Sequence, residues 1–279
     1  MKKIIVVGGT HGNEWTGIYL IKHFSSTLQK KFNSLKIQFL QGNPKAFEAT
    51  RRFTETDLNR VFEAINNNKP QETYEYTRGL EIKKTIDDSS DGWLFDIHTT
   101  TSNLGSTLII TRDEIQNFKL AAYAQKKIPH LKIIYSPDPA KKYLVSQSEK
   151  GLMLEIGPIA NNLVDTRILN ETCFILETLL QGLTNDEENN SQGEIEVFEE
   201  VGDIFYPQVN GEIVATVHPD LQSKDFFPLK KGDFNFLGFD GKEYKYEGED
   251  ELFPIFINEA AYYPSKIAFG LCRRISKNT

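Results

Sequence analysis

The chain has 279 residues, with 32 lysines and arginines against 39 acidic residues, and a formal net charge of −7 at pH 7. This acidic balance argues against a general binder of nucleic acids or anionic membranes. No apolar run approaches the ~20 residues of a membrane span, and the first apolar stretch, residues 4–7, is too short for a signal peptide. The two cysteines are isolated and form no CxxC motif, so we predict a cytoplasmic protein.

The first half of the chain alternates apolar stretches of strand length with helical stretches. The predicted strands are residues 4–7, 35–40, 93–97, 107–111, 132–135 and 152–156. The predicted helices are residues 15–24, 118–127 and 166–180. This alternation predicts an α/β fold with a mostly parallel sheet that is covered by helices.

The character of the sequence changes after residues 184–193, a polar segment without apolar periodicity that we interpret as a linker. Beyond it, short predicted strands at residues 212–217 and 243–246 are separated by Asn-Gly, Lys-Gly and Asp-Gly turns. We therefore predict two domains, an α/β domain over residues 1–188 and a smaller β-rich domain over residues 189–279.

Ionisable side chains lie at the ends of three predicted strands. His11 and Glu14 follow the first strand, His98 directly follows residues 93–97, and Glu155 lies near the end of an otherwise apolar run. Ligands bind beyond the carboxyl ends of the strands in an open α/β sheet, so we expect these four side chains to meet at one edge. Imidazole and carboxylate groups are zinc ligands, and three of them would leave the fourth tetrahedral position for water, as in a catalytic zinc site.

Each of these residues also has a simpler interpretation. A single histidine more often forms hydrogen bonds than binds a metal, and the spacing of His11 and Glu14 arises by chance in many chains. Glu155 could be one half of a buried ion pair. Gly8 and Gly9 do not complete a GxGxxG motif, so a dinucleotide-binding loop is not expected.

A second polar group lies in residues 51–60 and contains Arg52, Asn59 and Arg60. A guanidinium group binds a carboxylate through two parallel hydrogen bonds, so this group suits a pocket for an anionic ligand in a chain that is itself acidic. A solvated charged loop is the alternative interpretation.

Taken together and in this order, the motifs of the chain resemble those of aspartoacylases. They are GGTHGNE at 8–14, DLNR at 57–60, DIHTTTSN at 96–103, EIGP at 155–158, HPDLQ at 218–222 and NEAAYY at 258–263. The similarity covers nearly the whole chain. It implies a zinc carboxypeptidase-like fold, with a mixed, mostly parallel sheet and helices on both faces, and a β-rich C-terminal domain that closes the active-site channel.

The resemblance also implies an activity and a set of site residues. The family hydrolyses a small molecule, N-acetyl-L-aspartate, to acetate and L-aspartate with one zinc ion per chain, and the resemblance implies a homo-oligomer. By position, the implied zinc ligands are His11, Glu14 and His98, the implied catalytic residues are Glu155 and Arg52, and the implied substrate contacts are Asn59, Arg60, Tyr143 and Tyr262.

One segment departs from the family pattern. Animal aspartoacylases carry an arginine before the strand of the catalytic glutamate, and it contacts a substrate carboxylate. Gln147 is the nearest counterpart of this arginine here, and Lys141, Lys142 or Lys150 could take the role of the arginine. A neutral amide binds a carboxylate more weakly than a guanidinium group does. Two alternatives therefore stay open: a deacylase of N-succinyl or N-acyl aromatic amino acids, and an inactive metal-binding or interaction protein on the same fold.

Overall fold

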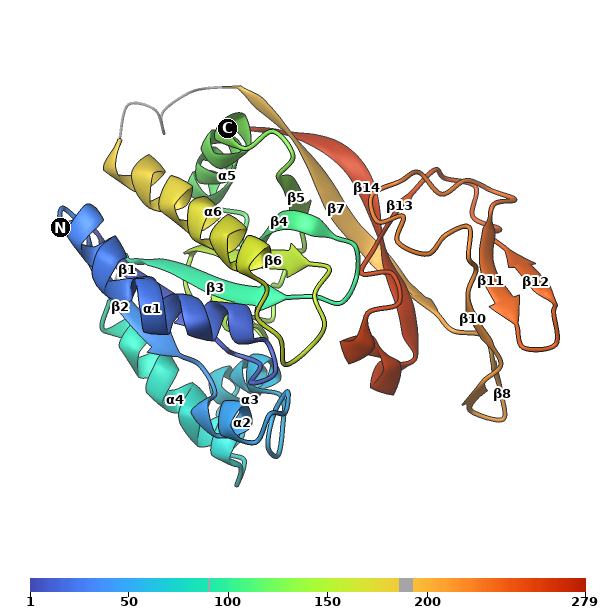
Figure 1. Cartoon of the computed structure of the whole chain (residues 1–279), viewed down its shortest axis with the longest axis horizontal. Helices are drawn as coiled ribbons and strands as arrows, with labels where there is room; N and C mark the ends of the chain where they lie inside the picture. Colours follow the sequence, from blue (N-terminus) through green and yellow to red (C-terminus); the bar gives the residue numbers. More distant parts are fainter. Residues whose placement is uncertain (90, 186–192) are drawn as a thin grey trace.

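The computed structural model describes residues 1–89, 91–185 and 193–279. Within them, one central sheet contains the strands β1 (Lys3–Gly8), β2 (Lys36–Gln41), β3 (Trp93–Thr99), β4 (Gly105–Ile110), β5 (Lys132–Tyr135), β6 (Lys150–Gly157), β7 (Glu194–Phe205), β13 (Phe253–Ile255) and β14 (Ile267–Asn278). Their order across the sheet is β13-β14-β7-β5-β4-β6-β3-β1-β2 (Figure 1).

Five of the eight strand pairings in this sheet are parallel. The antiparallel pairs are β4 with β6, β7 with β14, and β13 with β14. The predicted mixed, mostly parallel sheet is therefore confirmed.

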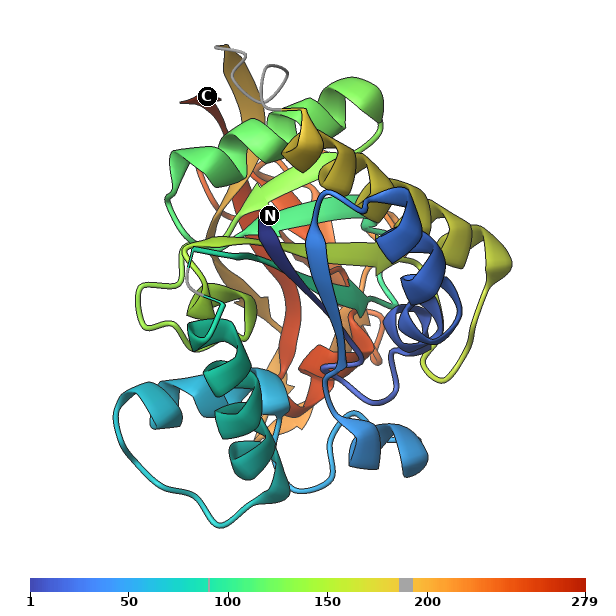
Figure 2. The ribbon, with the colours of Figure 1, turned by 90° about the vertical axis from the view of Figure 1, so that its left-hand side faces the viewer.

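Helices cover both faces of the sheet, as predicted. They are α1 (Trp15–Lys31), α2 (Pro44–Glu48), α3 (Val61–Asn66), α4 (Tyr74–Asp87), α5 (Ile115–Lys127) and α6 (Thr166–Thr184), with short 3-10 helices η1 (Leu58–Arg60), η2 (Val145–Gln147) and η3 (Ala260–Ser265). Residues of α1, α5 and α6 pack on one face, and residues of α3 and α4 pack on the other (Figure 2). Alternate residues of β1 serve the two faces: Ile4 and Val6 face the first group, and Ile5 and Val7 face the second.

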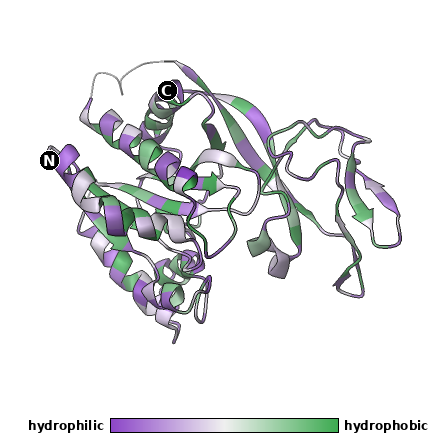
Figure 3. Ribbon diagram, in the orientation of Figure 1, coloured by the Kyte–Doolittle hydropathy of each residue, from purple (hydrophilic) through white to green (hydrophobic). Residues whose placement is uncertain are grey.

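The hydropathy of the chain follows these layers. The strands between the helix layers are largely hydrophobic, whereas the helices carry both hydrophobic and hydrophilic positions (Figure 3). Phe62, Phe95, Phe118 and Phe269 are among the largest side chains that are fully buried. None of the described helices combines the length and the apolar character that a membrane-spanning segment requires.

The C-terminal part is β-rich, as predicted, but it shares strands with the central sheet. The 12-residue strands β7 and β14 pair with each other, and β7 also pairs with β5. Farther out, β10 (Ala215–Val217), β11 (Phe234–Gly238) and β12 (Glu243–Lys245) form a second sheet, and β8 (Gln208–Val209) pairs with β9 (Glu212–Ile213). The C-terminal part therefore continues the wall of the central sheet on one side and has a small core of its own on the other.

Most predicted elements are present with shifted ends, but one prediction is wrong. Residues 212–217 were predicted as one strand but form two, β9 and β10. The strand is interrupted at Val214, whose backbone N–H donates a hydrogen bond to the carbonyl oxygen of Pro207 (2.9 Å). Helices α2 to α4 and strands β7, β13 and β14 have no counterpart among the predicted elements. Most of the predicted linker, and the predicted boundary at residue 188, lie outside the described residues.

Candidate active site

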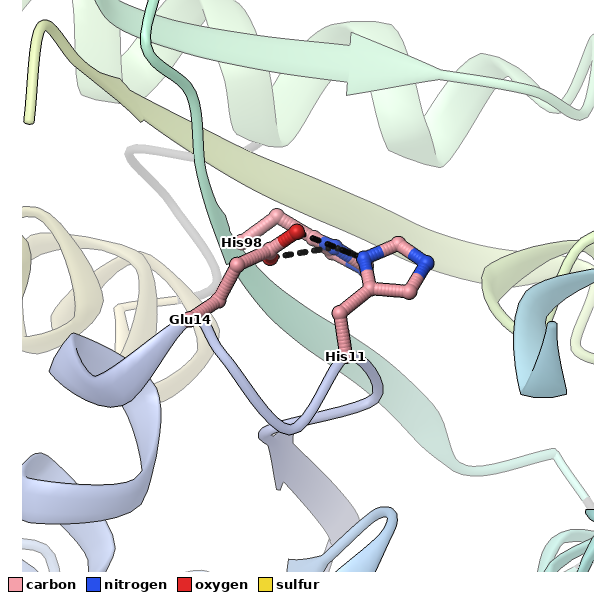
Figure 4. A group of neighbouring side chains, drawn as sticks. All are labelled: His11, Glu14 and His98. Atoms are coloured by element: carbon pink, nitrogen blue, oxygen red, sulfur yellow. Dashed lines mark hydrogen bonds and ion pairs between the residues drawn. The ribbon is translucent and has the colours of Figure 1, made fainter. Parts of the chain in front are cut away.

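Three potential metal ligands meet at the carboxyl ends of β1 and β3. His11 lies in the loop after β1, Glu14 directly precedes α1, and His98 lies on β3. All three are buried, with at most 4% of each residue exposed. Their potential ligand atoms lie within 4.8 Å of one another, and the side chains point toward a common centre (Figure 4).

The donor atoms of this cluster are two imidazole nitrogens and one carboxylate. Nδ1 of His11 lies 2.6 Å from Oε1 of Glu14, and Nδ1 of His98 lies 3.0 Å from Oε2 of the same carboxylate. The two Nδ1 atoms are 3.2 Å apart. Two imidazoles and one carboxylate are a ligand set found in catalytic zinc sites.

Glycines allow the loop between β1 and α1 to aim His11 and Glu14 inward. Gly9 has a φ of +73°, in the left-handed region that favours glycine. A Cβ atom on Gly12 would lie 2.3 Å from the backbone of Ala46 and Phe47, so the loop packs directly on α2 at this point. The path of the backbone therefore requires glycine at positions 9 and 12.

A carboxylate lies behind each histidine. Nε2 of His98 is 2.8 Å from Oδ2 of Asp96, and Nε2 of His11 is 3.1 Å from Oδ1 of Asp57. The hydroxyl of Thr10 donates a hydrogen bond to Asp96 (2.7 Å). When Nε2 donates its proton to a carboxylate, Nδ1 presents a lone pair to the centre of the cluster, which is the tautomer that a metal requires.

Neither Asp57 nor Asp96 was predicted to have a role of its own. A signal was present for Asp96, because it lies two residues before His98 and therefore on the same face of β3. Asp57 had no such local signal, since 46 residues separate it from His11.

The charges of the cluster stabilise one another. Burial raises the pKa of Glu14, but the two histidines outweigh this effect, so its pKa is lowered. Burial lowers the pKa of His98, and the carboxylates of Asp96 and Glu14 raise it well above its ordinary value. The donor set, its geometry and the supporting carboxylates all fit a divalent cation.

Glu155 and Arg52 lie beside this cluster. Glu155 is on β6 directly opposite His98 on β3, and it is 7% exposed. Burial raises its pKa well above the ordinary value, and the carboxylates of Glu14 and Glu259 add to the shift. Nη1 of Arg52 lies 3.3 Å from Oε1 of Glu14, and its Nε lies 3.3 Å from Oδ2 of Asp57.

All nine predicted site residues line a single pocket. This pocket has a volume of about 100 Å³, which suits a small molecule. The amide oxygen of Asn59 accepts a hydrogen bond from the backbone of Leu144 (2.8 Å), so its NH₂ group is the part available to a ligand. The guanidinium carbon of Arg60 lies 4.7 Å from the ring centre of Tyr143, while Tyr262 enters the pocket from η3.

Glu259 connects the C-terminal wall of the pocket to the loop after β3. Its carboxylate accepts hydrogen bonds from the hydroxyl of Thr100, from the backbone and hydroxyl of Thr101 (2.8 and 2.9 Å), and from the backbone of Ala261 (3.0 Å). The last contact begins η3, the element that carries Tyr262. The motif NEAAYY contained Glu259, but its contact with a loop more than 150 residues away has no signature in the sequence.

The four residues considered as substitutes for an arginine lie outside the pocket lining. The amide of Gln147 donates hydrogen bonds to the carbonyl oxygens of Lys141 (2.6 Å) and Tyr143 (2.9 Å), so this side chain stabilises the backbone that precedes it. The ammonium group of Lys141 pairs with Glu149, that of Lys150 pairs with Asp91, and that of Lys142 lies over the ring of Tyr143. Among the described residues, the arginines that line the pocket are Arg52 and Arg60.

The comparison with solved structures gives the class of protein. Murine aminoacylase 3 has the same fold, with a TM-score of 0.91 and 28% sequence identity over 99% of this chain and 96% of that chain. Together with the pocket, this similarity identifies an amide-hydrolysing enzyme.

Sequence comparison gives the family. Residues 1–183 match the succinylglutamate desuccinylase/aspartoacylase catalytic domain, and residues 193–274 match the AstE/AspA barrel-sandwich hybrid domain. The chain belongs to the succinylglutamate desuccinylase/aspartoacylase family.

Two relatives with the same sequence identity to this chain have names that refer to different substrates. A probable aspartoacylase of Trichodesmium erythraeum (strain IMS101) is 34% identical over 99% of this chain and 98% of that protein. The N-acyl-aromatic-L-amino acid amidohydrolase (carboxylate-forming) of Homo sapiens is 34% identical over 96% of this chain and 89% of that protein. Overall similarity therefore supports the reaction class and does not select the amino acid.

Proposed function

We propose that this protein is a zinc-dependent deacylase that hydrolyses the amide bond of N-acyl-L-amino acids. The observation that carries the proposal is the convergence of His11, Glu14 and His98 beside the buried Glu155. N-Acetyl-L-aspartate is the reference substrate, because the family resemblance implies it and one relative is named a probable aspartoacylase.

His11, Glu14 and His98 would hold the zinc ion. A zinc ion held there would supply Lewis-acid chemistry, namely polarisation of the scissile carbonyl and a pKa of water lowered toward ~7. Asp57 and Asp96 fix the orientation of the two imidazole rings.

Glu155 is the proposed general base and acid. Its carboxylate removes a proton from the attacking water, and the carboxyl then passes that proton to the leaving amine as the carbon–nitrogen bond breaks. Its buried position and raised pKa favour retention of the proton between the two steps. The guanidinium group of Arg52 donates hydrogen bonds to the developing negative charge on the carbonyl oxygen.

Asn59 and Arg60 are the proposed anchor for the α-carboxylate of the substrate. A guanidinium group can bind this carboxylate through two hydrogen bonds, and the amide of Asn59 can add a third. With the α-carboxylate fixed, the amide bond is presented to the reacting groups in one orientation.

The experiment that tests this proposal measures zinc content and hydrolysis of a panel of N-acetyl-L-amino acids by the same preparation. Bound zinc, and loss of hydrolysis after removal of the metal, are expected. Arg60→Ala should raise KM by ~10–100-fold, the loss expected for a hydrogen bond to a charged group. The neighbouring Arg51→Ala is the control, because exposed Arg51 does not line the pocket. A chain that binds zinc and hydrolyses none of the panel would be a metal-binding protein without this activity.

Three further predictions rest on the sequence. They are the division of the chain at residue 188, the homo-oligomeric assembly and the cytoplasmic location. Measurement of the mass of the purified protein in solution tests the second of them.

A further inference from the structure

One carboxylate in the pocket has no role in the proposed mechanism. Glu200 lies on β7, lines the pocket, and accepts a hydrogen bond from the hydroxyl of Ser136 at the end of β5. No motif of the family resemblance contains Glu200, and it enters the pocket from the C-terminal part of the chain.

The order of the strands places Glu200 far from the reacting groups. His98 lies on β3 and Glu155 on the adjacent β6, whereas Glu200 lies three strands beyond β6, across β4 and β5. With neighbouring strands ~4.8 Å apart, β6 and β7 are separated laterally by roughly 14 Å. The short side chain of an aspartate anchored near the metal cluster would not fill this distance.

The wall between these two carboxylates is apolar. Met153 on β6 lies opposite Ile109 on β4, and Ile109 lies opposite Ile134 on β5. All three line the pocket, and Ile255 adds a further apolar side chain from β13. A ligand in this part of the pocket therefore meets hydrocarbon along its length and a carboxyl group at its end.

The arginines of the described pocket lining are engaged elsewhere, so none of them is free to bind an acidic side chain at this end. Of the described arginines that line the pocket, Arg52 lies against Glu14 and Asp57, and Arg60 is the proposed anchor for the α-carboxylate. Burial raises the pKa of Glu200, the hydrogen bond from Ser136 and the charge of Lys142 act against this shift, and the nearby Asp203 adds to it. A hydrogen-bond donor or a positive charge on the ligand would offset the cost of burying this carboxyl group.

Glu200 shares its pocket with the proposed anchor for the amino-acid end of the substrate. Arg60, Tyr143, Tyr262 and Glu200 all line this pocket. The side chain of a substrate held by Arg60 can therefore extend past Tyr262 toward Glu200.

We propose that this end of the pocket binds the side chain of the substrate amino acid, and that Glu200 selects a long side chain that ends in a hydrogen-bond donor. N-Acetyl-L-lysine and N-acetyl-L-tyrosine have such side chains, whereas the side chain of N-acetyl-L-aspartate is shorter and its carboxylate offers Glu200 no hydrogen-bond donor. This assignment rests on the proposed deacylase function, and it gives Glu200 a role in specificity only.

The experiment compares kcat/KM for the N-acetyl derivatives of L-lysine, L-tyrosine, L-norleucine and L-aspartate. The zinc-loaded wild-type protein should hydrolyse the lysine or tyrosine derivative at least ~10-fold better than the aspartate derivative. Glu200→Gln should raise kcat/KM for the aspartate derivative and lower it for the lysine derivative. Together these changes should shift the ratio between the two by ~10–100-fold. L-Norleucine has the four-carbon chain of lysine without the ammonium group, so its value should change least.

Two variants control the comparison. Glu199→Gln removes the neighbouring charge, which does not line the pocket and projects to the opposite side of β7, and it should leave the ranking unchanged. Glu200→Asp keeps the charge and should keep the preference for the lysine derivative over the aspartate derivative. The wild-type ranking tests the proposal even where a variant does not fold.

The outcomes separate the two proposals. If the wild-type protein prefers N-acetyl-L-aspartate, or if Glu200→Gln does not change the ratio, the role of Glu200 is wrong while the deacylase function stands. If Glu200→Gln instead changes the preference between acetyl and succinyl groups on one amino acid, this end of the pocket binds the acyl group and the assignment is overturned. If the zinc-loaded protein hydrolyses none of the panel, the deacylase function itself is wrong.

Discussion

The two sides of the pocket are built in different ways. On the metal side, His11 and Glu14 come from one loop and His98 from an adjacent strand, and a carboxylate supports each histidine. On the opposite side, Glu200 comes from β7 and Tyr262 from η3, both in the C-terminal part. The first side lies at the carboxyl ends of β1 and β3, and the second is supplied by β7 and η3. This contrast predicts that changes on the metal side abolish catalysis, whereas changes on the C-terminal side alter substrate binding.

The largest effect should follow the loss of the carboxyl group of Glu155. Glu155→Gln should lower kcat by ~10²–10⁴-fold, because the amide cannot carry the proton from water to the leaving amine. Zinc content should stay the same, since Glu155 is not part of the cluster of potential ligands. Steady-state kinetics and metal analysis of one preparation measure both quantities.

Glu149→Gln is the matched control for this variant. Glu149 lies immediately before β6, and its side chain is 52% exposed and pairs with Arg112. If Glu155→Gln kept near-full activity, Glu155 would not be the general base. The expectation that changes on the metal side abolish catalysis would then be wrong.

An intermediate effect should follow a change behind the metal cluster. Asp96→Asn replaces the carboxylate that holds Nε2 of His98, so zinc affinity should fall by ~10–100-fold. Competition with a chelator of known affinity measures this change. Asp113→Asn is the control, because exposed Asp113 pairs with Lys277 away from the pocket. Equal zinc affinity in the Asp96 variant and the wild type would show that the carboxylate does not support the site.

The smallest effect on chemistry should follow a change on the C-terminal side. Glu259→Gln leaves fewer acceptors for the donors of Thr100, Thr101 and Ala261, so the free energy of unfolding should fall by ~1–3 kcal/mol. KM should rise because η3 and Tyr262 lose their fixed position, while zinc content stays unchanged. Thermal unfolding and steady-state kinetics measure the two effects.

Glu251→Gln provides the corresponding control, since Glu251 is 44% exposed and pairs with Lys230. If Glu259→Gln loses zinc as well, the two sides of the pocket are not independent, and the contrast between them is wrong.

The metal side was accessible to sequence reasoning because its residues follow a simple geometric rule. Parallel strands end at one edge of a sheet, so His11, His98 and Glu155 could be expected together from the ends of three predicted strands. The regular spacing along β3 also contained Asp96, two residues before His98. Local patterns were therefore sufficient for the potential metal ligands and for Asp96, but not for Asp57, which reaches His11 from 46 residues away.

The C-terminal side was not accessible in this way. The pairing of β7 with β5 joins segments about sixty residues apart, and nothing in either segment indicates which strand will be its neighbour. Glu200 lies in a charged part of β7 that does not show regular apolar alternation, so its burial depends on the cover supplied by the rest of the C-terminal part. The position of Glu200 depends on long-range strand pairing, and one sequence alone does not show which strands will pair.

The pairing of β7 with β5 also has a consequence for how the protein can be divided. β5 is apolar, with Ile133, Ile134 and Tyr135 buried, and β7 covers its outer edge. A fragment that stopped after α6 would expose this edge and its unpaired backbone groups, which are a template for aggregation. The two segments that match separate family domains are therefore one unit for expression and crystallisation.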